Sequence, residues 1–366
     1  MRNRDRIGVR PRVGGAVIIS GCVLLTSLGY GSTALAATGH KLAKIPKAGT
    51  TLVFEDSGGL LLQEEMQVFI KPFEEATGIN VEVESPVNFP AVQTQVAAHH
   101  VSVDLVEFSS EYAQEYCGSV LQNIDKYFDM SQYYANYIVS KCGVPESTFV
   151  HEFFYDKKDF PTNPPTTWAD FFNATKYPGQ RAVWNSGDGT NYEQALLGAG
   201  VSAKHLYPLN YTLAFKEWDK IKSSLVYWNT AAEAIQMMQS QSAPIIDAWG
   251  PFATEAVING ASNYVAEPAN PIFLNNQFMI PKGAPDLGAA LEFIRFATTT
   301  ARQLALVESY PEGPTNKAVQ PKTFANVILK RYYVGKYITK SVTTNVAWRA
   351  SHFPQMEAKW VAWASG

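Results

Sequence analysis

Polar side chains that could hold a small charged molecule follow the apolar strands that the sequence predicts. Asp56 and Ser57 come directly after the apolar run 52–54, and Asp188 lies in the loop after the apolar run 182–184. In open α/β sheets a ligand lies beyond the carboxyl ends of the strands, so we expect these side chains at the mouth of a cleft. Carboxylates can pair with an ammonium group there, and aromatic rings can pack on it. This pattern favours a binding site for a small amine.

Motifs that would indicate catalysis are missing from the sequence. It contains no Gly-x-Ser-x-Gly turn, no phosphate-binding P-loop, no His-Glu-x-x-His and no dinucleotide-binding glycine pattern after a strand. We expect His99, His100 and His205 to lie on the surface, and no pair of acids has a spacing that requires acid–base chemistry. No Cys/His cluster has the spacing of a zinc site. We therefore expect no enzyme, no cofactor and no metal site.

The elements that position these residues alternate between strand and helix. A strand at 52–54, an amphipathic helix that ends at Gly78 and a strand over 79–83 form a strand–helix–strand unit, whose two strands should be parallel. Thr300 and Gln303 form a Thr-x-x-Gln capping box that should begin another helix. Further strands are expected at 103–106, 182–184, 226–228, 245–250 and 278–280. The pattern is that of an α/β protein.

The amino-acid composition and net charge indicate which kinds of partner the protein can bind. The 366 residues are 46% hydrophobic and 17% charged, which is ordinary for a globular protein with a sizeable core. The net charge is −3, and five arginines lie within the first twelve residues, so the rest of the chain is more acidic than the total suggests. An acidic body argues against nucleic acid as a partner and is compatible with a cationic ligand.

The N-terminus has the pattern of an export signal. A basic stretch is followed by the apolar run 14–28 and then by Ala34-Leu35-Ala36, the small-x-small pattern that precedes a cleavage site. We predict a signal peptide over 1–36 and a periplasmic protein. The alternative is a lipoprotein anchored through Cys22, but the apolar run continues past this cysteine.

Cys117 and Cys142 remain once Cys22 is set aside. In an exported protein this pair favours one disulfide, whose closed loop would contribute about 3 kcal/mol of stability in the chain-entropy model. The alternative is two reduced, buried thiols.

Long stretches of the chain resemble the solute-binding proteins of ABC importers, in the group that includes spermidine/putrescine-binding proteins. The resemblance covers about 52–316 and is closest in the block 272–316, which contains IPKGAPD and ends in a Tyr-x-x-x-Pro-Thr-Asn turn. Other matching segments are FEEATGINV at 73–81, TWADFF at 167–172 and YPLNYTLAFKEWDKIK at 207–222. The tail after 316 matches only loosely.

The resemblance implies an α/β, two-lobe periplasmic-binding-protein fold (type II), in which each lobe is a mostly parallel sheet flanked by helices. Lobe 1 would comprise 37–148 and 275–315, and lobe 2 would comprise 149–274 and 316–366, with its tail helices packed on the outside. A hinge would let the lobes close on one small solute. The protein would then deliver this solute to a membrane permease and ATPase, would need no cofactor, and is expected to be a monomer.

The resemblance also implies which residues contact the solute. Asp56 and Ser57 stand where the family has a Trp-Thr pair, and Asp188 lies in the loop where polyamine binders place acids. The remaining candidates are Ser109, Trp184, Trp249, Asn276 and Tyr310. Some of them have structural alternatives: Trp249 could pack in the core, and Ser109 could cap a helix. We expect Asp247 to pair within its lobe, and Glu55, Glu111 and Glu312 to form a solvated rim.

Departures from the family pattern leave the solute open. Leu274 and Asn276 stand where polyamine binders carry a tryptophan and the aspartate that pairs with an ammonium group. Loss of that acid would cost on the order of 2–5 kcal/mol against a diamine unless another carboxylate, such as Asp56, replaces it. The candidates are therefore a polyamine, another small amine or an amino-acid-like or other zwitterion, or a neutral or anionic solute. A secreted enzyme or sensor domain on the same scaffold is the alternative from another class.

Overall fold

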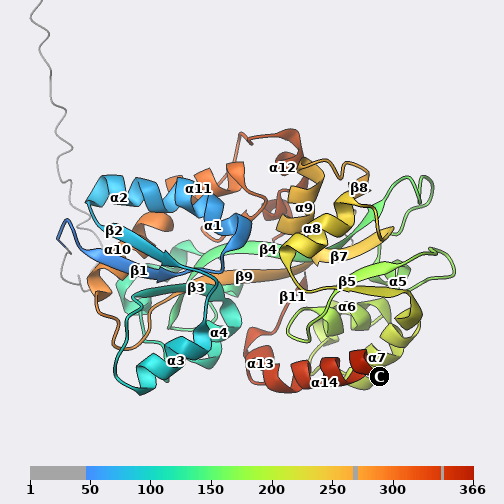
Figure 1. The fold of residues 1–366 in the computed structure, drawn as a ribbon, viewed down its shortest axis with the longest axis horizontal. Helices are drawn as coiled ribbons and strands as arrows, with labels where there is room; N and C mark the ends of the chain where they lie inside the picture. Colours follow the sequence, from blue (N-terminus) through green and yellow to red (C-terminus); the bar gives the residue numbers. More distant parts are fainter. Residues whose placement is uncertain (1–46, 267–270, 339–341) are drawn as a thin grey trace, which may run out of the picture. The chain divides into compact units, whose positions relative to one another are not determined.

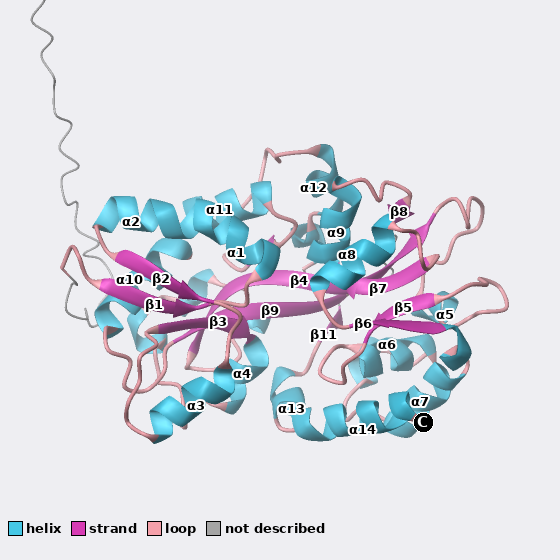
Figure 2. Ribbon diagram, in the orientation of Figure 1, coloured by secondary structure: helices cyan, strands magenta, loops and turns pink. Residues whose placement is uncertain are grey.

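Two sets of parallel strands share one continuous mixed sheet (Figures 1 and 2). The computed structural model describes residues 47–266, 271–338 and 342–366. The first strand set, in spatial order, is β2 (Asn80–Glu84), β1 (Thr51–Glu55) and β3 (Leu105–Ser109). The second strand set is β7 (Ile245–Trp249), β5 (Arg181–Trp184) and β6 (Leu225–Trp228).

Two long antiparallel strands join the two sets. β9 (Ile272–Met279) pairs with β3, and β4 (Gly143–Asp156) pairs with both β9 and β7. The register of β4 against β9 shifts between Pro145 and Thr148, so the sheet is irregular where it passes from one set to the other. The short strands β8 (Tyr264–Val265) and β10 (Gly313–Pro314) pair with β4, and β11 (Val342–Thr343) pairs with β9.

Helices cover both faces of the first strand set, and the alternation of strand side chains explains why. On β3, Leu105 packs into the core cluster on one face and Val106 into the cluster on the other. The first face carries α1 (Gly59–Glu65), the π-helical turn Met66–Ile70, α2 (Lys71–Thr77), α10 (Leu287–Ala297) and α11 (Thr300–Ser309). The second face carries α3 (Phe89–Ala97) and α4 (Ser110–Glu115).

The second strand set is covered in the same way. On β7, Ile245 and Ile246 pack on opposite faces, into two clusters dominated by different helices. One face carries α5 (Trp168–Phe171), α6 (Asn191–Gly198), α7 (Tyr211–Asp219) and α14 (Phe353–Ser365). The other carries α8 (Ala231–Gln239) and α9 (Gly250–Ile258), with α12 (Val327–Tyr332) packed on α9. α13 (Val346–Ala350) precedes α14.

The structure confirms some predictions made from local sequence patterns and contradicts one of them. The parallel pairing of β1 with β2 is confirmed, and Gly78 ends α2 in a left-handed conformation with φ of 71°. The capping box at Thr300 is wrong. Thr299 is the N-cap instead and accepts a hydrogen bond from the backbone N–H of Arg302, while the buried Gln303 donates to the carbonyl of Glu146. Either Thr299 or Thr300 could have been the N-cap. Burial of Gln303 in the core fixes the helix start so that Thr299 is the N-cap.

The predicted disulfide is confirmed. Cys117 and Cys142 are bonded, with their Cα atoms 5.3 Å apart. The bond ties the segment after α4 to the start of β4, in the core cluster that also contains Ala113 and Met279.

The tail contacts more of the molecule than predicted. α14 packs on the second strand set as expected, through Met356 and Trp360. α13, however, packs against α4, which belongs to the first strand set. The contact between α13 and α4 was not predicted from the sequence.

The remaining predictions on chain organisation stay predictions. The lobe boundaries 148/149 and 274/275 fall inside β4 and β9, which run through both strand sets. The predicted signal peptide over 1–36, with Cys22, lies outside the described residues. Within those residues, no helix has the length and apolar character needed to cross a membrane.

Candidate functional site

A cavity of about 260 Å³ lies at the carboxyl ends of strands from both sets. Ser57 follows β1 and Ser109 ends β3, whereas Trp184 ends β5 and Trp249 ends β7. Parallel strands place their carboxyl ends at one edge of a sheet, so residues far apart in the sequence meet here.

Seven of the eight predicted contact residues line this cavity, namely Ser57, Ser109, Trp184, Asp188, Trp249, Asn276 and Tyr310. The exception is Asp56, which is fully buried and accepts a hydrogen bond from the backbone N–H of Gly58 at 2.6 Å. Leu274 lines the cavity beside Asn276. The structure thus brings the predicted residues together, and their contact with a solute remains a prediction.

Aromatic rings form much of the cavity wall. The Trp184 and Trp249 rings meet edge to face, with centroids 3.9 Å apart, and Phe252 and Phe149 pack on Trp249 at 5.1 and 6.1 Å. The indole N–H of Trp249 is buried and has no hydrogen-bond partner among the described residues. Such a donor is costly to leave unpaired, and a ligand oxygen could satisfy it.

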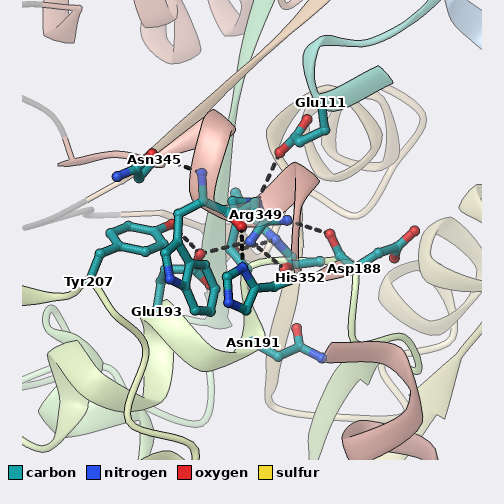
Figure 3. A network of polar contacts seen from close by, with 12 residues as sticks. Glu111, Asp188, Asn191, Glu193, Tyr207, Asn345, Arg349 and His352 are labelled. Carbon is teal, nitrogen blue, oxygen red and sulfur yellow. Dashed lines mark hydrogen bonds and ion pairs between the residues drawn. The ribbon is translucent and has the colours of Figure 1, made fainter. Parts of the chain in front are cut away.

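Arg349 of α13 lies in the wall of the same cavity and pairs with two buried glutamates (Figure 3). Its Nε donates to Glu111 of α4 at 2.9 Å, and one terminal nitrogen donates to Glu193 of α6 at 2.7 Å. The guanidinium also donates to the backbone carbonyls of Gly189 and Asp188. Within the described chain these four bonds leave one of its five N–H groups for another partner.

The environment of Arg349 keeps it charged. Burial by itself lowers the pKa of this guanidinium, but the carboxylates of Glu193 and Glu111 raise it above its ordinary value. The side chains of Arg349, Glu111 and Glu193 are at most 1% exposed. Tyr207 donates a further hydrogen bond to Glu193. The network joins α4, which packs on the first strand set, to α6, which packs on the second.

Sequence reasoning missed Arg349, and it assigned Glu111 to a solvated rim. The rim prediction is wrong for all three acids concerned, because Glu55, Glu111 and Glu312 are at most 4% exposed. Arg349 lies in the tail, where the family resemblance is loose, so no local signal pointed to it. The one available signal for Glu111 was its position two residues after the predicted contact residue Ser109.

Five buried carboxyl groups cluster behind the cavity. Asp56, Glu65, Glu107, Glu146 and Glu312 are each at most 3% exposed, and none forms an ion pair with a Lys, Arg or His of the described chain. Ser57 links the cluster to the cavity, since its hydroxyl and backbone N–H donate to Glu107 at 2.6 and 3.2 Å. Glu312 itself lines the cavity.

Burial raises the pKa of every carboxyl in this cluster. It does so for Asp56, and it places the pKa values of Glu65, Glu107 and Glu146 well above the ordinary range, with neighbouring acids of the cluster adding to the effect. For Glu312, burial raises the pKa to about 8. A carboxyl that keeps its proton near neutral pH avoids the cost of an unpaired buried charge.

A hydroxyl, an imidazole and a carboxylate form a series beneath Trp249. Thr190 Oγ1 lies 2.7 Å from Nδ1 of His151, and Nε2 of His151 lies 2.9 Å from Asp247. This is the order of groups in a hydrolase triad, but all three side chains are fully buried and none lines the cavity. Gln194 bonds both Thr190 and Asp247. The expectation that Asp247 pairs within its own part of the fold is confirmed.

No set of three or more His, Cys, Asp or Glu side chains in the described residues is arranged to hold a metal ion. The polar groups that face the cavity suit an organic solute. Acids and aromatic faces can bind an ammonium group, and the Trp249 and Arg349 N–H groups can bind a carboxylate.

Comparisons with known proteins show what the chain is similar to. The family described as bacterial extracellular solute-binding protein matches residues 69–329. A gamma-aminobutyric acid (GABA)-binding protein of Pseudomonas aeruginosa is 26% identical over 320 residues, which cover 84% of this chain and 89% of that protein.

Two solved structures extend the comparison. A GABA receptor is 25% identical with a TM-score of 0.79, and the match covers 86% of this chain and 98% of that one. An ABC transporter substrate-binding protein from Bradyrhizobium japonicum is 24% identical with a TM-score of 0.77, covering 86% and 99% of the two chains.

Replacement of Arg349 should destabilise the fold strongly. Arg349→Met would leave Glu111 and Glu193 buried without a cation, and we expect the free energy of unfolding in urea to fall by about 3–5 kcal/mol. The control is Arg295→Met, whose partner Glu292 lies 3.3 Å away and is 44% exposed, so the loss should stay below about 1 kcal/mol. Equal losses in the two variants would contradict the assigned role of Arg349.

The carboxyl cluster should make the fold less stable as the pH rises. The folded state keeps protons that the unfolded chain releases near pH 4.5, so the stabilisation is complete below that pH and is lost as the pH rises toward about 8, the pKa of Glu312. Each unit of raised pKa corresponds to about 1.4 kcal/mol. Urea unfolding at pH 5 and pH 8 measures the loss.

A matched pair of variants assigns that loss to the cluster. Glu65→Gln removes one buried titrating group and should reduce the difference in stability between pH 5 and pH 8. Glu75→Gln, at an exposed position of α2, should leave the difference as it is in the parent protein. A Glu65→Gln profile that coincides with the parent profile would mean that Glu65 is ionised in the folded protein.

Proposed function

The chain belongs to the family of bacterial extracellular solute-binding proteins, and from this premise we propose that it captures a small amino-acid-like zwitterion for an ABC importer. The solute carries an ammonium group and one carboxylate, as GABA does. The protein has the periplasmic-binding-protein fold that the sequence predicted. The observation that carries the proposal is a small aromatic cavity in which acids outnumber cations.

The cavity charges support an ammonium group in the solute. Among the residues that the structure describes, Glu111, Asp188 and Glu312 line the cavity together with one cation, Arg349. This cation already pairs with Glu111 and Glu193. An anionic solute would meet Asp188 and an Arg349 that is already paired. An ammonium group would be attracted to Asp188, and it could pair with Glu312 once this carboxyl releases its proton. The aromatic faces of the wall add a cation–π contribution of roughly 0.5–2 kcal/mol.

Donors in the same cavity support a carboxylate in the solute. The unpartnered indole N–H of Trp249 and the remaining N–H of Arg349 can both donate to an oxygen. A volume of about 260 Å³ falls below the range of about 300–1,000 Å³ that is usual for drug-sized ligands. A solute of a few heavy atoms fits this size.

A second acidic hollow keeps a diamine such as putrescine as the second candidate. A cavity of about 290 Å³ shares Glu111, Tyr112 and Asp188 with the first and adds Glu115 and Glu357. These carboxylates could attract a second ammonium group, which a polyamine carries and a zwitterion lacks. Asp56, which we expected to compensate for Asn276, does not line either cavity, so Glu312 takes that role in this proposal.

The role in transport follows from the family. Solute-binding proteins of ABC importers deliver their ligand to permease and ATPase components, and we propose that this chain does so from the periplasm. Hinge closure about β4 and β9, between the predicted lobes, would enclose the solute. We propose that the protein acts as a monomer and without a cofactor.

A thermal-shift panel tests the proposed solute. GABA should raise the melting temperature, since a ligand at about 100 times its dissociation constant adds roughly 2.7 kcal/mol of stability. Butyrate, which lacks the ammonium group, should cause no shift. A shift with putrescine and none with GABA would favour the diamine. The absence of a shift with any amine would contradict the proposal.

The indole N–H of Trp249 should contribute to affinity. Trp249→Phe keeps an aromatic ring but removes the donor, so the dissociation constant for GABA should rise about fivefold, which corresponds to about 1 kcal/mol. Trp363→Phe is the control, because the Trp363 indole N–H donates to Asp219 at the end of α7 and Trp363 does not line the cavity. Equal GABA affinities for Trp249→Phe and the parent protein, measured by calorimetry, would remove Trp249 as a ligand donor.

A further inference from the structure

Two polar side chains at one end of the cavity are buried without a partner. The hydroxyl of Tyr310 and one carboxyl oxygen of Glu312 have no hydrogen bond among the described residues, although these side chains are only 4% and 3% exposed. Both residues line the cavity, as does Ser57. Burial, together with Glu312, raises the pKa of Tyr310 well above its ordinary value, so its hydroxyl stays neutral and can accept a hydrogen bond. The N–H groups of an ammonium ion could bond both of these oxygens.

The carboxyl cluster continues directly behind these residues. Glu107 accepts two hydrogen bonds from Ser57, and Asp56 precedes Ser57 in the chain. The charges of Glu146 and Glu312 act on each other, and Glu65 interacts with both Asp56 and Glu146. The five groups come from the residue after β1, from the middle of β3, from the end of α1, from β4 at its register shift and from the residue before β10.

We propose that Ser57, Tyr310 and Glu312 form the subsite for the solute's ammonium group, and that the group enters in exchange for a proton held by the carboxyl cluster. The proposal rests on the proposed function, because it requires a solute with an ammonium group. In the exchange the O–H bond of a protonated carboxyl breaks and its proton passes to solvent. The carboxylate that remains pairs with the ammonium group, so these two charges cancel in the subsite, and the released proton leaves the complex as a whole with one positive charge less.

The surroundings favour this exchange over permanent ionisation. Other charged groups that face the subsite are acids: Glu64 of α1 and Glu255 of α9 act on Tyr310, and Glu111 and Asp188 line the cavity. Arg349 lines the same cavity but is already paired with Glu111 and Glu193. Without a solute, the cluster therefore meets more negative charge and no free cation within the described residues. A pKa of about 8 for Glu312 means that it holds its proton at pH 7.

Proton exchange would make affinity depend on pH. Between pH 5 and pH 8 a zwitterion such as GABA keeps both charges, because its groups titrate near those of Lys and Glu side chains, at about 10.4 and 4.3. Any change in affinity over this range then reports on the protein. If one proton is released on binding, the affinity rises up to about tenfold for each pH unit until Glu312 is ionised without solute.

Isothermal titration calorimetry with GABA as the probe tests the proposal in the intact protein. Titrations at pH 7 in phosphate and in Tris, which differ in ionisation enthalpy, give the number of protons released. We expect a release approaching one proton per GABA, and we expect the dissociation constant to fall as the pH rises from 5 to 8.

Glu312→Gln, which is close to isosteric, should abolish most of the release. Glu107→Gln is the second variant and should reduce the release, and Glu75→Gln, exposed on α2, should not change it.

The outcomes separate this proposal from the proposed function. GABA binding without proton release, or release that persists in both Glu312→Gln and Glu107→Gln, would overturn the exchange and leave the solute assignment intact. Binding of neither GABA nor putrescine would overturn both. Proton release with putrescine alone would support the exchange and favour the diamine as solute. Tyr310→Phe provides a further check on the subsite, and an unchanged affinity in this variant would remove Tyr310 from it.

Discussion

The buried guanidinium of Arg349 is the interaction on which the arrangement of the cavity depends. It pairs with Glu111 beside the first strand set and with Glu193 beside the second. All three side chains are almost completely excluded from water. Three charges in such a position are tolerated only when each is paired, because an unpaired buried ion costs several kcal/mol. The chain therefore has to bring α13 between α4 and α6. In doing so it completes the wall of the cavity with a segment more than 150 residues after either glutamate.

The opposite condition holds at the other end of the cavity. The five carboxyls behind Ser57 have no described cation beside them, and burial raises their pKa values instead. The two solutions for buried acids, pairing and protonation, thus occur within one site. The paired acids fix the structure, whereas the protonated acids remain free to exchange a proton for a positively charged ligand. In a site of this kind the buried carboxyls become negatively charged, and so complementary to a cation, only when the cation binds and a proton leaves.

The sequence predicted most of the fold and most of the cavity lining, because both depend on local patterns. Apolar runs and Gly78 located the strand–helix–strand unit, and polar residues after strands located Ser57, Ser109 and Asp188. What could not be predicted depends on contacts between distant segments. Arg349 has no recognisable local pattern, and the burial of Glu312 depends on α11, β4 and β10 packing around it. From the sequence alone, Thr299 and Thr300 are equally good N-caps. The choice of Thr299 depends on the burial of Gln303 against β4, which is a contact with a distant segment.

A crystal structure of the protein with GABA would show where the ammonium group and the carboxylate of the solute lie. We expect density for one GABA molecule in the cavity of about 260 Å³, with its nitrogen within about 3.2 Å of Glu312 and its carboxylate toward Trp249 and Arg349. A molecule bound in the reverse orientation, or bound at another place while this cavity holds only water, would contradict this expectation.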